Sequence, residues 1–211
     1  MARFRLGLSL VLTALILIPL AFGLLITPPG TTFLGYPYNT DDHMVYAAWM
    51  RQAAEGHVLF SNRFTLDPQP GLTIHLFFLV LGWLSVGVGT LGATVLAQIA
   101  MAFAFVHLLD DLLGRMGLPD QARRLGLIVA TFGGGMGFLM WRTFGIAVTP
   151  EDAKGMPFGS LLANQLPTDV WQPEGFAFSS LFTNALFGWA LVLILLAFRQ
   201  ILRVREGRKG W

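Results

Sequence analysis

The chain contains no cysteine and few charged residues for its length. Without cysteine it can form no disulfide, no thiolate metal site and no cysteine nucleophile. Charged residues make up only 12% of the 211 residues, whereas a soluble domain usually carries about 25%. The formal net charge of +2 is too small to indicate a nucleic-acid interface. Because 55% of the residues are hydrophobic, the composition predicts a protein embedded in membrane lipid.

Four apolar segments are expected to cross the membrane as helices, because about 20 apolar residues span a bilayer. They cover residues 6–26, 91–113, 125–144 and 176–198. A fifth apolar segment, 72–89, is marginal in length and is interrupted by glycines. The first segment is longer than the apolar core of a signal peptide and lacks a small-residue cleavage site. It therefore predicts a helix that stays in the mature protein.

The lysine and arginine residues decide whether 72–89 crosses the membrane. If it crosses, four of them lie in the cytoplasm and ten outside; if it does not, these numbers are reversed. Membrane proteins concentrate these residues on the cytoplasmic side. We therefore expect 72–89 to be an interfacial or re-entrant segment, with the N-terminus and the basic tail 199–211 in the cytoplasm. The expected fold is an all-α, polytopic transmembrane helical bundle of about four spans, one membrane domain over 1–211, in the inner or plasma membrane.

The loop 27–71 is expected outside the cytoplasm and contains the chain's main concentration of ionisable side chains. Within it, residues 41–55 combine helical spacing of apolar side chains with acids in the first turn, and Gly56 follows as a stop signal. This pattern predicts a short amphipathic helix at the membrane interface.

Asp41 and Asp42 have two interpretations that the sequence leaves open. Adjacent carboxylates attract divalent cations, so the pair could serve as a general base or as ligands of Mg or Mn. Acids in a first helical turn also stabilise the helix dipole, by about 0.3–1 kcal/mol each. The histidines of the loop match no zinc-ligand spacing, so zinc is not expected.

A second polar cluster precedes the last expected span, at the end of the outer loop 145–175. Glu174 follows a proline where a helix begins, so it also fits a first-turn acid, and Trp171 fits an interfacial anchor. In the four-span topology this cluster shares the outer face with Asp42. Two carboxylate clusters with Trp, Tyr and Arg around one outer cleft would form a sugar site.

Two further features are expected to be structural. The glycine run 133–137 lies in an apolar segment and lacks the lysine and hydroxyl of a phosphate-binding loop, so it predicts close helix packing or a kink. Asp110 and Asp111, near the end of the span 91–113, predict solvated carboxylates on the cytoplasmic side.

The chain resembles the N-terminal part of a GT-C superfamily integral membrane glycosyltransferase. The resemblance begins with a first span and an outer loop whose two aspartates open an interfacial helix. The matching motifs are Asp42-x-x-x-Tyr46, Arg51-Gln52-Ala53-Ala54-Glu55-Gly56, Asn62-Arg63-Phe64-Thr65, and Pro173-Glu174 with Phe178, Ser180, Leu181 and Thr183. This arrangement is similar to uncharacterised bacterial GT-C-like membrane proteins. Leu186 stands where their later motif has a histidine.

The resemblance implies transfer of a sugar from a polyprenyl-phosphate carrier at the outer face. An acid of the first loop would act as base or hold Mg or Mn, and an arginine would meet the lipid phosphate. The implied catalytic residues are Asp41, Asp42 and Glu174. The implied substrate-binding residues are His43, Tyr46, Arg51, Arg63 and Trp171. Because the family's module has more spans, we expect this chain to be a fragment or a reduced form.

Two other classes of protein compete with this interpretation. A non-catalytic membrane subunit or scaffold needs no complete transferase module. A transporter is less favoured, because the sequence shows no inverted repeat and no span with a central charge. The sequence does not name the sugar, the acceptor or the oligomeric state.

Overall fold

The computed structural model describes residues 1–36, 39–135 and 172–207, and its regular secondary structure there is entirely helical. This confirms the all-α expectation for the described residues. Three of their helices are long and apolar enough to cross a membrane, which indicates a membrane-embedded protein. They are α1 (Ala2–Ile26), α3 (Leu76–Arg115) and α9 (Ala185–Arg205). The sequence predicted four.

The first outer loop contains the helix α2 (Thr40–Ala54), within one residue of the predicted segment at each end. The following loop folds back on itself, and one isolated antiparallel bridge joins Phe60 to Thr73. The buried amide of Gln52 holds this loop against α2, because its Oε1 accepts from the Ser61 backbone N–H at 2.8 Å and its Nε2 donates to the Ser61 carbonyl at 3.1 Å. The loop is therefore anchored at both of its ends.

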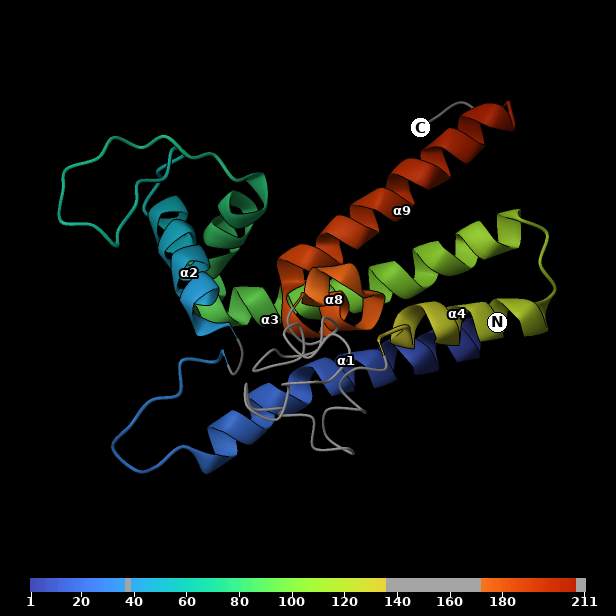
Figure 1. Cartoon of the computed structure of the whole chain (residues 1–211), viewed down its shortest axis with the longest axis horizontal. Helices are drawn as coiled ribbons and strands as arrows, with labels where there is room; N and C mark the ends of the chain where they lie inside the picture. Colours follow the sequence, from blue (N-terminus) through green and yellow to red (C-terminus); the bar gives the residue numbers. More distant parts are fainter. Residues whose placement is uncertain (37–38, 136–171, 208–211) are drawn as a thin grey trace, which may run out of the picture.

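The helix α3 changes direction at Gly89, whose φ of 74° and ψ of 165° are not helical. A positive φ of this kind is easily adopted only by glycine. Before the kink, α3 packs on α2 through Phe78, Leu79 and Leu81. After the kink it packs between α1 and α9, and Figure 1 shows these long helices side by side with α2 at the far end. The two parts of α3 match the predicted segments 72–89 and 91–113.

The other two predicted spans differ from the structure. The helix α4 (Asp120–Phe132) ends inside the predicted span 125–144, because the consecutive glycines that follow from Gly133 do not continue it. The residues of that span beyond 135 lie outside the described part of the chain. The predicted span 176–198 is divided into α8 (Ala177–Thr183) and α9, with the extended residue Asn184 between them. The helix α9 then continues into the predicted tail.

Ion pairs join four helices at one end of the bundle. Asp110 on α3 is completely buried, and its carboxylate pairs with Arg123 on α4 at 2.6 Å and with Arg5 on α1 at 3.1 Å. Its neighbour Asp111 pairs with Arg199 on α9 at 2.7 Å. The prediction of a solvated Asp110 was therefore wrong: helices distant in sequence supply the arginines that compensate the buried carboxylate.

Candidate functional site

The first turn of α2 places its two aspartates differently. Asn39 precedes the helix in a left-handed conformation, and its Nδ2 donates to Asp42 Oδ2 at 2.5 Å. Asp41 and Asp42 are both exposed, but only Asp42 acts electrostatically on the buried ring of His43 and the half-buried ring of Tyr46. Asp42 therefore faces the aromatic side of α2, whereas Asp41 has no recorded link to it.

His43 is the buried ionisable residue of this turn. Its ring stacks on that of Tyr36, with centroids 4.5 Å apart and planes 9° from parallel, and the ring of Tyr46 meets its edge at 5.9 Å. Burial lowers the pKa of His43, while a hydrogen bond with the Thr183 backbone and the charge of Asp42 partly oppose this shift. The imidazole is thus favoured in its neutral form, which can donate from one nitrogen and accept at the other.

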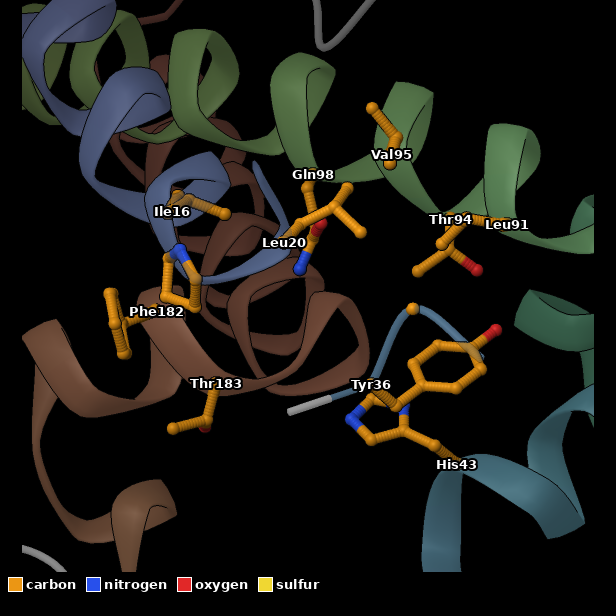
Figure 2. A pocket seen from close by; sticks show the side chains of 12 residues that line it. Ile16, Leu20, Tyr36, His43, Leu91, Thr94, Val95, Gln98, Phe182 and Thr183 are labelled. Atoms are coloured by element: carbon orange, nitrogen blue, oxygen red, sulfur yellow. The ribbon is translucent and has the colours of Figure 1, made fainter. Parts of the chain in front are cut away.

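A hollow of about 150 Å³ lies beside this imidazole, among α1, α2, α3 and α8. Figure 2 shows its wall of apolar side chains and, at the end near α2, the stacked rings of Tyr36 and His43. The apolar lining residues are Ile16, Pro19, Leu20, Leu91, Val95 and Phe182. The polar lining side chains are Tyr36, His43, Thr94, Gln98 and Thr183. The hollow therefore suits a ligand with an apolar part and a polar end.

Aromatic stacking joins α2 to the first part of α3. The ring of Tyr46 stacks on Phe78 with centroids 4.5 Å apart, and Trp49 stacks on His75 at 5.8 Å. Burial raises the pKa of Tyr46, and the charge of Asp42 raises it further. The phenol therefore stays protonated and can donate a hydrogen bond. Tyr46 does not line the 150 Å³ hollow but a much smaller neighbouring compartment, which shares Tyr36, His43 and Thr94 with it.

The structure does not bring the predicted arginines into this hollow. Arg51 is exposed and pairs with Glu55 on its own helix at 2.9 Å. Arg63 lies at a second hollow of about 390 Å³, between α2 and the loop that follows it. That hollow is also lined by Val45, Ala48, Trp49, Ser61, Asn62, Phe64 and Thr73. The expected single cleft is therefore divided among different faces of α2.

The second predicted cluster is only partly described. Glu174 is exposed in the short helix η1 (Pro173–Gly175) and does not line the hollow, and Trp171 lies outside the described residues. The segment after η1 does reach the hollow, because α8 supplies Phe182 and Thr183. The shared cleft is thus approached by α8 rather than by Glu174.

The described side chains form no preformed cluster of metal ligands around the two aspartates. Among them, no three His, Asp or Glu residues come together as a candidate metal site. Asp42 is already held by Asn39, and Asp41 is exposed beside it without a third carboxylate. Mg usually keeps several waters and is bound through one or two carboxylates together with substrate phosphates, so metal binding at the two aspartates stays a prediction from the sequence.

Several lining residues were missed by the sequence reading. Thr94 and Gln98 are polar residues at i and i+4 within an apolar segment, so they share one face of α3. Polar side chains in such a segment usually face the interior of a bundle, and this signal was present. Tyr36 had no comparable signal, because an irregular loop brings it over His43.

Comparisons of the chain with protein-family models, curated proteins and solved structures found no match.

Proposed function

We propose that this chain is a GT-C-like membrane glycosyltransferase that uses a polyprenyl-phosphate-linked sugar at the outer face of the membrane. The observation that carries the proposal is the hollow beside α2, with an apolar wall on α1 and α3 and a polar end at His43. A prenyl chain needs apolar contact, and a phosphosugar needs hydrogen-bond partners. Both requirements meet at one place, where His43 lines the hollow and the charge of Asp42 acts on its ring.

The proposed reaction displaces the carrier phosphate from the sugar. The acceptor's hydroxyl oxygen forms a bond to the anomeric carbon, the bond between that carbon and the phosphate oxygen breaks, and the phosphate leaves with the polyprenyl chain. The proton of the hydroxyl passes to a base, for which Asp42 and the neutral ring of His43 are the candidates. Asp42 also stabilises the imidazolium if His43 takes the proton.

The membrane orientation supports the same proposal. The ends of α1, α3, α4 and α9 that meet in the ion-pair network hold Arg5, Arg115, Arg123 and Arg199. Under the positive-inside rule this end is cytoplasmic, and α2 then lies on the outer side. Glu174, Arg51 and Arg63 stay predictions from the resemblance, and Arg63 lines the second hollow, not the one beside His43.

Asp42→Asn tests the chemistry, with Asp41→Asn as its matched control. The amide at position 42 keeps a side chain that can contact Asn39 but loses the negative charge. We expect loss of general-base assistance to reduce sugar transfer about 10²–10⁴-fold. The exposed Asp41 is expected to tolerate the same change. The measurement is transfer from a panel of polyprenyl-phosphate hexoses by the full-length protein in liposomes, with expression and folding checked in parallel.

Two outcomes would contradict this proposal in different ways. Full transfer by both variants would make the carboxylates structural. Binding of farnesyl phosphate by the unmodified protein without any transfer would instead assign a non-catalytic, lipid-binding subunit. The orientation in the membrane is tested separately. Because the chain has no cysteine, a single cysteine introduced at Thr40 or at Gln121 is the only residue that a thiol reagent can label. An impermeant thiol reagent added outside should label the first and not the second.

A further inference from the structure

Asn184, the residue between α8 and α9, uses only the oxygen of its side-chain amide in a hydrogen bond. Its Oδ1 accepts from the Leu186 backbone N–H at 2.9 Å and thereby caps α9. The residue is only 4% exposed, and its Nδ2 is a buried donor without a hydrogen-bond partner in the described part of the chain. A buried donor of this kind costs free energy unless an oxygen outside the protein satisfies it. The cap explains the oxygen of this amide and leaves its nitrogen unexplained.

The space beside Asn184 has the size of one oxygen atom with its protons. A compartment of about 10 Å³ has Asn184, His43, Tyr36, Tyr46 and Thr94 as its polar lining. The rest of its lining is apolar and consists of Met50, Phe77, Phe78, Leu81 and Ala185. Roughly 10–15 Å³ of such space is needed to hold one water molecule. The compartment shares Tyr36, His43 and Thr94 with the larger hollow described above. The two spaces therefore adjoin each other at these side chains.

The surrounding groups select the kind of oxygen. The Asn184 Nδ2 can only donate. In its neutral form His43 donates from the nitrogen that meets the Thr183 backbone, so its other nitrogen holds a lone pair. Figure 2 shows a ring nitrogen of His43 on the Thr183 side, with Tyr36 covering the ring. An oxygen that accepts from Asn184 and donates to His43 is a hydroxyl or a water oxygen, because a deprotonated phosphate oxygen has no proton to give.

The N-terminus of α9, which begins directly after Asn184, adds a partial positive charge on the same side of the compartment as the Asn184 donor. The partial positive charge at a helix N-terminus favours an oxygen that is gaining negative charge. A hydroxyl oxygen becomes more negative as it loses its proton. Asn184 and the first turn of α9 therefore stabilise that oxygen while His43, with the charge of Asp42 acting on its ring, takes the proton.

We propose that this compartment is the binding site for the acceptor's hydroxyl oxygen, that a water molecule takes its place in the free protein, and that Asn184 orients this oxygen. The identity of the ligand as a sugar acceptor rests on the proposed function. The oxygen site itself rests on the geometry of Asn184 and is testable without any transfer activity.

The Asn184→Ser variant keeps the capping acceptor of α9 but removes the buried amide donor. A serine hydroxyl can still accept from the Leu186 N–H, but it lacks the amide nitrogen. Asn184→Ala removes both the cap and the donor. Gln121→Glu, at an exposed position on α4, is the control for changing a side-chain amide far from the site. We expect the thermal midpoint to fall for the alanine variant and to stay close to that of the unmodified protein for the serine variant and the control.

The first measurement is nuclear magnetic resonance of ¹⁵N-labelled protein in micelles of a detergent without hydroxyl groups. We expect cross-relaxation between water and the Asn184 side-chain amide protons, and a His43 ring whose lone-pair nitrogen shows the ¹⁵N shift of a hydrogen-bond acceptor. In Asn184→Ser that His43 shift should move to the value of a free nitrogen, and in Gln121→Glu it should not. A dry amide, or a His43 shift that Asn184→Ser leaves unchanged, overturns the oxygen site.

The second measurement identifies the source of the oxygen by adding octyl glucoside as the probe. We expect its hydroxyl to displace the water, so the water signal at Asn184 is lost while the acceptor shift at His43 is kept. Retention of the water signal at saturating probe shows a structural water only and overturns the acceptor assignment. If the displacement is seen but full-length protein transfers no sugar, the proposed function fails and the oxygen site stands.

Discussion

The two ends of the described bundle hold their polar groups in opposite ways. At the end where α1 begins, the buried groups are formal charges, and the carboxylate of Asp110 is compensated by Arg5 and Arg123. At the end where α2 lies, the charged Asp41 and Asp42 are exposed, and the buried polar groups there, which include His43 and the amides of Gln52 and Asn184, carry no full charge.

This difference separates a structural role from a binding role. Separating a buried carboxylate from its two arginines costs free energy of folding. The end that contains Asp110, here called the ionic end, therefore fixes how α1, α3 and α4 pack. The α2 end instead has a hollow, a donor without a protein partner and rings held by stacking. Neutral groups can exchange one hydrogen-bond partner for another at small cost, which is the property that a ligand site needs.

Removing the buried carboxylate of the ionic end should reduce the free energy of unfolding more than any other change proposed for these two ends. Asp110→Ala leaves Arg5 and Arg123 partly buried without their carboxylate. Removing one member of a buried ion pair costs about 3–5 kcal/mol, and we expect a loss near the lower value because both arginines keep some contact with solvent. The measurement is the free energy of unfolding in mixed micelles.

Asp120→Ala is the matched control, because Asp120 also pairs with Arg123, at 3.3 Å, but its side chain is 59% exposed. Exposed pairs are worth about 0–1 kcal/mol, so the control should lose little. Equal losses for the two variants would show that burial of Asp110 does not matter and would remove the contrast between the two ends.

Breaking the α2 end requires a change in packing rather than in charge. Gly82 on α3 lies against α2, and a Cβ there would come within 2.6 Å of the Met50 carbonyl oxygen and would overlap Ala53. Because backbone atoms cannot move aside cheaply, Gly82→Ala should destabilise the protein by about 1–3 kcal/mol and detach α2. Protease cleavage within residues 40–54 measures the detachment.

The same substitution at Gly87 is its control, because a Cβ at this position of the same helix meets nothing within 4 Å. Alanine is favoured over glycine in a helix by up to about 1 kcal/mol, so Gly87→Ala should keep or raise stability. If Gly82→Ala leaves cleavage at the level of Gly87→Ala, α2 is not held by this close contact.

The sequence predicts the positions of the helices better than the polar groups buried between them. Apolar length predicts α1 and most of α9, and the acids with Gly56 predict α2 to within one residue. Apolar length does not reveal the break at Asn184, because one capping side chain produces it within an otherwise apolar stretch. The burial of Asp110 is equally hidden, since its partners belong to helices that only tertiary packing brings near.

Part of the candidate site was also predictable. His43 and Tyr46 lie close to Asp42, as their spacing within about one helical turn predicts for any fold. Arg51 and Arg63 were grouped with them by their shared loop, yet they lie at other faces of α2. Proximity along an irregular loop does not set direction, whereas helical spacing does.

Acidification should produce the smallest effect and should act on the α2 end through His43. Burial lowers the pKa of His43 in the folded protein below the unfolded value of about 6.5, so the unfolded chain binds the proton more readily. Stability should therefore be complete above that value and should fall as the pH drops from it toward the folded pKa. His75, whose pKa burial also lowers, contributes in the same direction.

His43→Gln removes the titrating ring, and it should flatten the decline of the thermal midpoint between pH 7 and pH 5 only in part, because His75 still titrates. The residual slope should disappear when His75→Gln is added. The exposed His57→Gln variant should keep the slope of the unmodified protein. A slope that His43→Gln leaves intact would mean that the imidazole is solvated in the folded protein. The neutral acceptor that the α2 end requires would then be absent, and the contrast with the ionic end would be lost.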